Sequence, residues 1–245
     1  MNETFSIEFG VGACESDCFS RLRPSSLMRF IQEAAIGHVL ELGIDRAWTL
    51  EHLDSVWMVI RTRVDLKRPI MYDETVTIKT WAAETKGAVF PRESEIFVGG
   101  ESVGEVSATW VIANIDTGRM LRPKALFELA EFPDLGAPRF KPVEKIQPIE
   151  PLGAPEVHRV RYSDMDMNRH VNNTRYTDFA ADHIDLETMP DKWIRSMTVS
   201  FSSQCVAGDD LVLASANDGD RWYVRGSSPE GRIHFEQEFI LADVK

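Results

Sequence analysis

The sequence predicts an α+β protein built as two similar units, each with a long helix packed against an antiparallel sheet. Three observations support this class. An amphipathic helix pattern occurs once in each half of the chain. Each helix pattern is followed by strand-like segments in which apolar residues recur at every second position. A proline-rich stretch separates the halves, and a helix followed by a sheet, occurring twice, indicates α+β architecture.

Length and charge exclude several functional classes. With 245 residues, the chain is one large domain or two small ones. Its formal net charge of −12 makes it a poor candidate for binding nucleic acid, which needs a basic face. No run of 18 apolar residues occurs, so we expect no membrane span. The first residues lack the basic and apolar regions of a secretory signal.

The cysteine content indicates a reducing compartment. The three cysteines, Cys14, Cys18 and Cys205, are an odd and sparse set, which argues against a disulfide framework. Cys14 and Cys18 have C-x3-C spacing, but no second Cys/His pair completes a zinc site. We therefore expect a cytoplasmic protein without a bound metal.

The proline-rich stretch sets the expected domain boundaries. Residues 131–155 contain six of the twelve prolines. Proline fixes φ and removes a hydrogen-bond donor, so this stretch reads as an extended linker. The sequence thus predicts an N-terminal unit over residues 1–130 and a C-terminal unit over residues 156–245.

The first unit begins with a short strand at 5–9 and continues with a helix. Pro24 suits the start of this helix and Gly43 its end. One stripe of apolar residues at i, i+3, i+4, i+7 and i+8 should be buried: Leu27, Phe30, Ile31, Ala34 and Ala35. A strand with apolar even positions is expected over 56–66, and further strands over 73–81, 88–98 and 103–114.

The second unit follows the same plan. A strand is expected at 157–162, and a helix that starts at Asn172 or Asn173. Its predicted buried stripe is Tyr176, Phe179, Ala180, His183 and Ile184. Strands are expected over 193–202, 210–216, 221–226 and 232–241. The repeat is imprecise in register by one residue. Side-by-side pairing of the two sheets would protect their edges and give a pseudo-dimer within one chain.

The densest polar cluster lies in residues 162–179. Asp164, Asp166, Asn168 and His170 alternate with other residues, which in extended backbone places them on one side of the chain. They end where the second helix starts, and a helix start offers unpaired N–H groups. Such a set could polarise a carbonyl group. It could equally cap the helix and satisfy a turn, and spacing alone leaves both interpretations open.

Residues 164–176, DMDMNRHVNNTRY, resemble the D-x-N-x-H-V-N-N-x-x-Y motif of the acyl-acyl carrier protein thioesterases, plant plastid and bacterial enzymes that release fatty acids. The first half also resembles this family. The similar positions there are residues 23–35, Trp57 and Arg61 in W-x3-R spacing, Pro69, Asp73 and Thr80-Trp81. The resemblance covers nearly the whole chain, in order, including the linker.

The resemblance implies a double hotdog fold, two helix-wrapped antiparallel sheets in one chain, with the acyl chain held by the first hotdog and catalytic groups carried by the second. It implies that Asp166, Asn168 and His170 are catalytic. Asp166 would be the nucleophile or the base that activates water. Asn168 would orient Asp166 or the water, and His170 would assist proton transfer. Backbone N–H groups of Val171 and Asn172 would polarise the thioester carbonyl.

One position departs from the family pattern. On the strand after the second helix the family has a Glu, often followed by Cys, whereas this chain has Gln204-Cys205. Gln204 cannot act as a base but could position water, so Asp166 would have to activate it. Cys205 shares parity with apolar residues of that strand, which favours a buried thiol. A Cys-His-Asn nucleophilic arrangement is the sharper alternative.

An acyl thioester on a carrier protein needs an apolar slot and a basic surface for an acidic carrier. Candidate acyl-binding residues are Met28, Trp57, Met58 and Trp81, although each also suits an ordinary core. The basic run 61–68 is the candidate carrier-docking surface, although it also suits a solvated strand face. Its cations are Arg61, Arg63, Lys67 and Arg68.

The sequence therefore favours hydrolysis of fatty acyl thioesters on acyl carrier protein, in fatty acid biosynthesis, with no metal or redox cofactor. An acyl-CoA thioesterase is the second hypothesis. The third is a catalytically silent acyl-binding or sensor protein, motivated by Gln204. A dehydratase fits the motif at the helix start less well. Acyl chain length, saturation and association as a homodimer stay open.

Overall fold

The computed structural model describes residues 3–244, which divide into two compact units. Of the described residues, unit 1 comprises 3–11, 30–64 and 73–143, and unit 2 comprises 12–29, 65–72 and 144–244. The sequence predicts one boundary in the linker. The structure instead groups two N-terminal segments, 12–29 and 65–72, with the C-terminal half of the chain.

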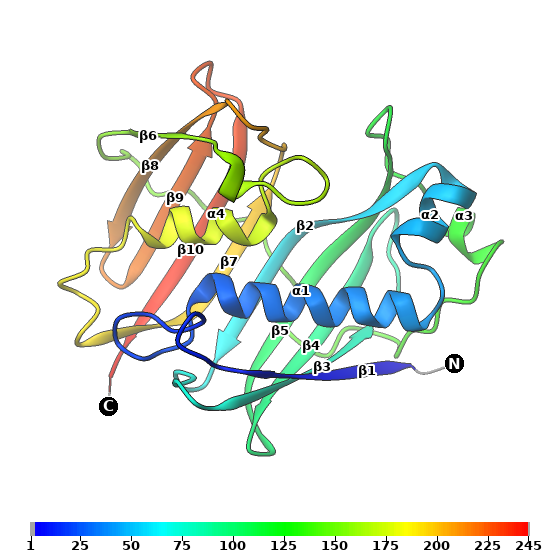
Figure 1. The fold of residues 1–245 in the computed structure, drawn as a ribbon, viewed down its shortest axis with the longest axis horizontal. Coiled ribbons are helices and arrows are strands. Elements are labelled where there is room, and N and C mark those ends of the chain that lie inside the picture. Colours follow the sequence, from blue (N-terminus) through cyan, green and yellow to red (C-terminus); the bar gives the residue numbers. More distant parts are fainter. Residues whose placement is uncertain (1–2, 245) are drawn as a thin grey trace. The chain divides into compact units, whose positions relative to one another are not determined.

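The five strands of unit 1 form an antiparallel sheet in the order β1-β3-β4-β5-β2, with α1 lying across it (Figure 1). All five lie close to predicted strands. Their bounds are β1 Thr4–Gly10, β2 Ser55–Leu66, β3 Thr75–Ala82, β4 Phe90–Val98 and β5 Glu101–Asn114.

The long helix α1, Pro24–Glu41, confirms the helix predicted from the apolar stripe. All five residues of that stripe are buried, with at most 6% of their surface exposed. Gly43, just beyond the end of the helix, has φ of +70°, a conformation that glycine adopts without cost. Within the helix, Gly37 lets the ring of Phe5 from β1 approach closely, because a Cβ there would lie 2.6 Å from that ring.

Two short helices of unit 1, α2 (Arg46–Leu53) and α3 (Pro123–Phe127), were not predicted. Asp45 caps α2 by accepting a hydrogen bond from the Trp48 N–H, and Pro123 stands in the first turn of α3. Both are too short to show a helical period in the sequence. They lie beside a cluster of buried residues that includes Ile44, Phe90, Ile112 and Leu126.

The strand β2 follows the predicted alternation only in its second part. Thr62 and Val64 are buried, as the even-position pattern predicts. Earlier in the strand Val59 is buried while Met58 is 44% exposed, so the buried parity switches between residues 59 and 62. A uniform period of two across the whole strand was therefore wrong.

The proline-rich stretch is extended, as predicted, and its first part is tied to unit 1. The Leu135 N–H donates to the carbonyl of Ala82. The N–H groups of Arg139 and Phe140 donate to Oε1 of buried Glu93, at 2.8 and 2.7 Å. These hydrogen bonds fix a segment that would otherwise be a free connector.

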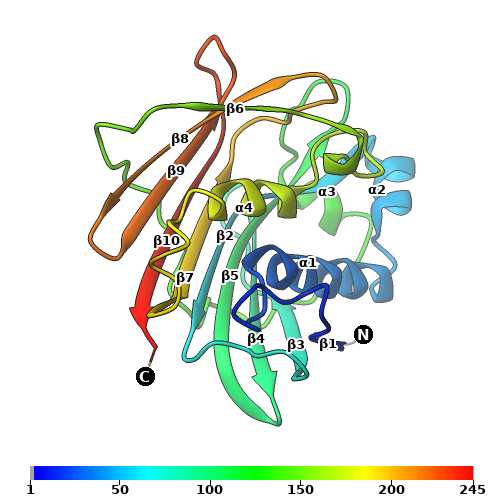
Figure 2. The same ribbon diagram turned by 60° about the vertical axis from the view of Figure 1, so that its left-hand side comes forward.

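Unit 2 has its own antiparallel sheet, in the order β7-β10-β9-β8-β6, with α4 lying over it (Figure 2). Its five strands again match predicted strands. The bounds are β6 Glu156–Arg159, η1 (a 3-10 turn) Tyr162–Asp164, α4 Asn173–Ala181, β7 Lys192–Phe201, β8 Asp210–Asp218, β9 Arg221–Ser227 and β10 Ile233–Asp243.

The helix α4 begins where predicted and ends earlier. Asn172 is its N-cap and accepts a hydrogen bond from the Thr174 N–H at 2.9 Å. Tyr176, Phe179 and Ala180 are buried against the sheet. His183, placed in the buried stripe, lies beyond the helix end and is half-buried.

Among the described residues, no helix combines the length and apolar character needed to cross a bilayer. The three cysteines are free thiols, with Cys14 and Cys18 exposed and Cys205 buried.

Candidate active site

The polar motif before α4 is a folded turn, not the extended segment that alternation predicted. Residues Tyr162–Asp164 form η1, and the Asp166 N–H then donates to the carbonyl of His170 at 2.9 Å. The Arg169 N–H donates back to the carbonyl of Asp166, and Arg169 has φ of +65°. Residues 166–170 thus close a tight loop, here called the motif turn, and the idea of one polar side of an extended chain was wrong.

Within the motif turn, Asp166 and Asn168 are in direct contact. The Asn168 N–H donates to Oδ1 of Asp166 at 2.7 Å, and its Nδ2 lies 3.3 Å from Oδ2. The Asp166 side chain is half-buried, and His170 is half-buried two residues beyond Asn168. The motif turn therefore brings a carboxylate, a carboxamide and an imidazole into five consecutive residues, with the carboxylate orientation fixed.

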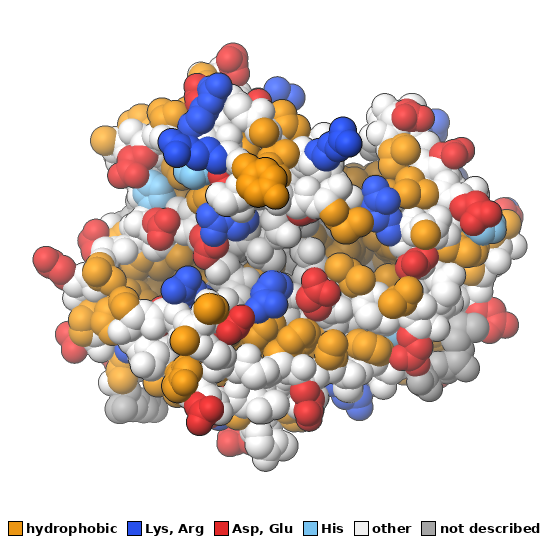
Figure 3. Space-filling model, in the orientation of Figure 1, with side chains coloured by type: hydrophobic (Ala, Val, Ile, Leu, Met, Phe, Trp, Pro, Cys, Tyr) orange, Lys and Arg blue, Asp and Glu red, His pale blue; other side chains and the backbone are white. Residues whose placement is uncertain are grey.

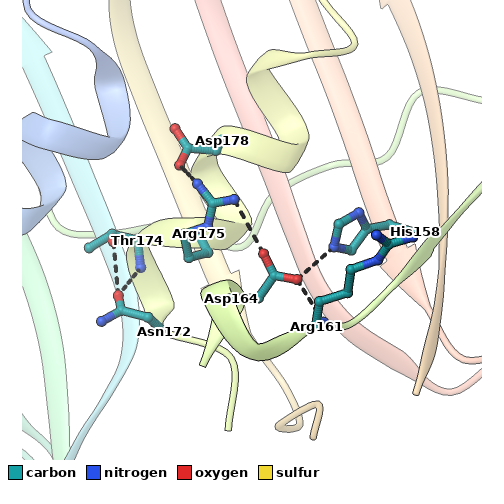
Figure 4. Close-up of polar contacts among 7 residues, drawn as sticks. All are labelled: His158, Arg161, Asp164, Asn172, Thr174, Arg175 and Asp178. Atoms are coloured by element: carbon teal, nitrogen blue, oxygen red, sulfur yellow. Dashed lines mark hydrogen bonds and ion pairs between the residues drawn. The ribbon is translucent and has the colours of Figure 1, made fainter. Parts of the chain in front are cut away.

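Asp164, two residues before the motif turn, contacts His158, Arg161 and Arg175 of the same unit (Figure 4). It is 2% exposed, and its carboxylate receives three donors. Nη2 of Arg175 lies 3.2 Å from Oδ1, while Nε2 of His158 and the Arg161 N–H each lie 2.9 Å from Oδ2. Arg175 also pairs with Asp178, one turn along α4.

These contacts change the acidity of Asp164. Burial alone raises the pKa of this carboxyl, but hydrogen bonds from Arg161, His158 and Arg175 outweigh burial, so its pKa is lowered. Asp164 is therefore a fixed buried anion, which suits a structural support better than a group that exchanges protons.

The two N–H groups expected to polarise a carbonyl are already engaged. The Val171 N–H donates to the carbonyl of Cys205, and the Asn172 N–H donates to the carbonyl of Asp164, both at 2.9 Å. Each N–H satisfies a backbone acceptor, so in this conformation neither is free for a substrate. This part of the sequence interpretation is corrected.

The Gln204-Cys205 segment lies beside the motif turn through the same Val171 hydrogen bond. The Cys205 N–H also donates to the hydroxyl of Tyr176 on α4 at 3.2 Å. Cys205 is fully buried, and burial raises the pKa of its thiol, which disfavours the thiolate that a nucleophile needs. Gln204 is exposed. Of the two interpretations of Cys205, the structure favours the buried core thiol.

Unit 1 contains an apolar cavity of about 40 Å³. Trp57 lines it, as expected for an acyl-binding residue, whereas Met58, Trp81 and Met28 do not. Met58 is 44% exposed, and Trp81 is buried with its Nε1 donating to Glu93 at 3.1 Å. Met28 is buried on α1. The cavity is lined by Ala35, Ile36, Val39, Trp57, Ala82, Phe90, Pro91, Arg92, Trp110 and Phe132.

One residue of the cavity lining, Arg92, is a buried cation. Arg92 is 6% exposed, and its Nη1 lies 2.9 Å from Nδ1 of His38 and 3.2 Å from Oγ1 of Thr80. Burial lowers the pKa of Arg92 to about 10. Within residues 3–244, no carboxylate forms an ion pair with it.

The basic run 61–68 is less available than the sequence suggested. Arg61, Arg63 and Arg68 are half-buried, and only Lys67 among the four cations is exposed. Arg68 donates to the carbonyl of Pro69, and Arg63, Lys67 and Arg68 all make further interactions within the chain.

Sequence reasoning missed the importance of several buried polar residues. The sequence indicates Asp164 only as part of the polar alternation or as a helix cap. Arg92 and Glu93 went unnoticed, although two adjacent charges inside a predicted strand are a signal, since one of the two must face inward. The hydroxyl of Tyr176, which reaches the Gln204-Cys205 segment, had no sequence signal beyond the motif itself.

The fold and site together define a double hotdog protein, with one helix-wrapped antiparallel sheet in each unit and a polar turn at the start of the second helix. An acyl-ACP thioesterase from Bacteroides thetaiotaomicron has a similar structure, with a TM-score of 0.86, 20% identity and 98% of both chains covered. The 12:0-ACP thioesterase of Umbellularia californica has a TM-score of 0.86 at 17% identity, over 100% of this chain and 99% of that one. These likenesses confirm the predicted fold.

The family models for the acyl-ACP thioesterase N-terminal and C-terminal domains match residues 2–125 and 153–238. The chain therefore belongs to the acyl-ACP thioesterase family, as its motifs suggested.

Among curated proteins, oleoyl-acyl carrier protein thioesterase 1 of Arabidopsis thaliana is 23% identical over 88% of this chain and 64% of its own length. The dodecanoyl-[acyl-carrier-protein] hydrolase of Cinnamomum camphora is 29% identical over 78% of this chain and 53% of its own length. This chain thus spans about half to two thirds of these relatives.

Proposed function

We propose that this protein hydrolyses fatty acyl thioesters carried on acyl carrier protein, as a step of fatty acid biosynthesis. The observation that carries this proposal is the motif turn: a carboxylate held by its neighbouring carboxamide, next to an imidazole, in a chain that both family models match. Relatives named as acyl carrier protein thioesterases support the substrate class.

The chemistry we infer starts at Asp166. Its carboxylate either removes a proton from the water that attacks the thioester carbonyl, or attacks that carbonyl itself. In the second case the thiolate leaves, and water then hydrolyses the acyl anhydride on Asp166 to release the fatty acid. Asn168 holds the carboxylate in one orientation, which reduces the reorganisation needed during reaction. His170 supplies, as a general acid, the proton that the departing thiolate sulfur needs.

The donor that polarises the carbonyl must come from outside the Val171 and Asn172 backbone, because both N–H groups are engaged. Among the residues of the motif turn, the side chains of Asn168 and His170 can donate hydrogen bonds. The exposed Gln204 side chain, close in the chain to the Cys205 carbonyl that accepts from Val171, would position water.

The acyl chain would enter the apolar cavity of unit 1, and Trp57, which lines the cavity, would contact it. At about 40 Å³ the cavity accepts only a few atoms in this conformation. Its walls include large aromatic side chains that must repack to admit a longer chain.

The test is Asp166→Asn, assayed for thiol release from a matched acyl-carrier and acyl-CoA pair. Loss of the carboxylate should lower turnover by about 10³-fold or more, with the fold intact by thermal melting. Asp218→Asn, at an exposed carboxylate on β8, is the matched control and should keep wild-type turnover. Near-normal thiol release by Asp166→Asn would remove Asp166 from the mechanism. Saturable acyl binding without cleavage by the wild-type protein would favour an acyl-binding protein.

A further inference from the structure

Two large apolar side chains, one just before the motif turn and one within it, are unusually exposed. Tyr162 is 94% exposed and Met167 is 82% exposed, the two highest fractions among the large apolar side chains of the described residues. Tyr162 opens η1, and Met167 lies within the motif turn. Large apolar side chains held in water at one place mark an interaction surface more often than isolated ones do.

Two arginines accompany them. Arg161 precedes Tyr162 and Arg169 follows Met167 by two residues, and both are exposed. Across residues 3–244, no carboxylate forms an ion pair with either guanidinium group. Figure 3 shows Lys and Arg side chains around a protruding hydrophobic side chain over the region of η1 and the following loop.

Neighbouring arginines behave differently. Arg159 pairs with Asp210 at 2.8 Å, and Arg175 pairs with Asp164 and Asp178. Asp166, three residues before Arg169 in the chain, accepts hydrogen bonds from Asn168. Arg161 and Arg169 are therefore the charges in this segment that an external anion can meet without first breaking an internal pair.

Because the rest of the chain is acidic, this local positive surface indicates where an acidic partner would bind. At a net charge of −12, the molecule as a whole repels an acidic protein. An acidic partner would be steered to the place where cations stand unpaired, and complementary charges would fix its orientation there. Tyrosine and arginine are also residue types that contribute strongly to protein–protein binding.

We propose that Arg161, Tyr162, Met167 and Arg169 form the surface, here called the motif rim, that docks an acidic carrier protein. This inference rests on the proposed function, because the carrier must deliver its thioester to Asp166. The Arg169 N–H donates to the carbonyl of Asp166 at 3.0 Å, so the rim and the reacting carboxylate belong to one turn. The motif rim replaces the run 61–68, whose arginines are half-buried.

The experiment compares three substrates with the same acyl group: an acyl-carrier thioester, acyl-CoA and the uncharged acyl-pantetheine thioester. Arg161→Glu/Arg169→Glu should lower kcat/KM for the acyl-carrier substrate about tenfold or more, because rim charges govern encounter. The rate with acyl-pantetheine should stay within about twofold, because this small substrate carries no acidic surface. Tyr162→Ala should likewise affect the carrier substrate selectively.

The control is Arg119→Glu/Arg122→Glu, which makes the same charge change at two exposed arginines of unit 1 and should leave all three rates unchanged. The wild-type rate with the carrier should fall as salt rises, and that dependence should flatten in the motif-rim variant. The proposal is overturned if the carrier rate stays within twofold of wild type. It is also overturned if acyl-pantetheine or acyl-CoA loses as much activity as the carrier substrate.

Binding of holo-carrier, followed by titration calorimetry, separates this inference from the proposed function. If the wild-type protein cleaves no thioester but binds the carrier through the motif rim, docking stands and the hydrolase proposal fails. If it cleaves thioesters and the variant binds and processes the carrier normally, the hydrolase proposal stands and the motif rim fails.

Discussion

Nη2 of Arg175 lies 3.2 Å from Oδ1 of Asp164, and this ion pair ties α4 to the residue that precedes the motif turn. Asp164 is almost fully buried, while Arg175 retains 38% side-chain exposure. The carboxylate has therefore lost its water and depends on its three protein donors. The pair fixes where the motif turn begins relative to the helix that follows it.

Removing the cation from this pair should destabilise the protein. In Arg175→Met the buried Asp164 carboxylate keeps His158 and the Arg161 N–H but loses its guanidinium donor, at a cost of about 2 kcal/mol in the free energy of unfolding. Urea unfolding at pH 7 measures this. Arg159→Met, which breaks an exposed pair with Asp210, is the control and should change stability by less than about 0.5 kcal/mol. Equal effects of the two variants would contradict the account.

The pH dependence of the free energy of unfolding should reveal the protonation of the Asp164 carboxylate. Because its folded-state pKa is lowered, its stabilising contribution is complete above the unfolded value of about 3.9 and is lost as pH falls through the folded value. The difference in unfolding free energy between wild type and Asp164→Asn should thus be largest at neutral pH and shrink below about pH 4. Unfolding curves at pH 7, 5, 4 and 3 provide the measurement. A difference that stays constant with pH would mean that charge is not the cause.

The linker should loosen when Glu93 loses its charge. Glu93 accepts from the N–H groups of Arg139 and Phe140 and from Nε1 of Trp81. In Glu93→Gln one acceptor oxygen becomes a donor facing another donor, which should cost about 1–3 kcal/mol. Hydrogen exchange at Arg139 and Phe140 should accelerate. Glu95→Gln, on the same strand but half-buried, is the control, and unchanged exchange in Glu93→Gln would refute this attachment.

Cys205 should prove unnecessary for turnover. Since it is fully buried and its thiol pKa is raised, Cys205→Ala should keep activity within about threefold of wild type. Iodoacetamide should label Cys14 and Cys18 in the folded protein, and all three cysteines after unfolding, as read by mass spectrometry. A loss of activity comparable to that of Asp166→Asn would restore the Cys-His-Asn alternative.

The elements with strong periodicity were predictable from sequence. The stripe of α1 is long enough to show the helical period, and its end is marked by Gly43. The start of α4 is set by one residue, Asn172, whose side chain caps it. The switch of buried parity in β2 was not predictable, because it depends on which neighbouring element covers each half of the strand.

The sequence picks out the segment that holds the candidate site, but not the backbone geometry of that segment. Alternation drew attention to Asp164, Asp166, Asn168 and His170, whose catalytic roles stay predictions, but it assumed an extended backbone. The left-handed conformation at Arg169 bends the segment into a turn, and no glycine marks that position in the sequence. The engagement of the Val171 and Asn172 N–H groups depends on the carbonyls of Cys205 and Asp164, and the contact with Cys205 is made only in the folded chain.

The interleaving of the two units sets a rule for how this protein can be divided. Because residues 12–29 and 65–72 group with the C-terminal half, no single cut yields either unit with all its parts. A fragment that starts at residue 144 would lack both stretches, including the segment from which Arg21 donates to the carbonyls of Met189 and Lys192. Exchanging one unit between related proteins would therefore mean transplanting three separate pieces of chain together.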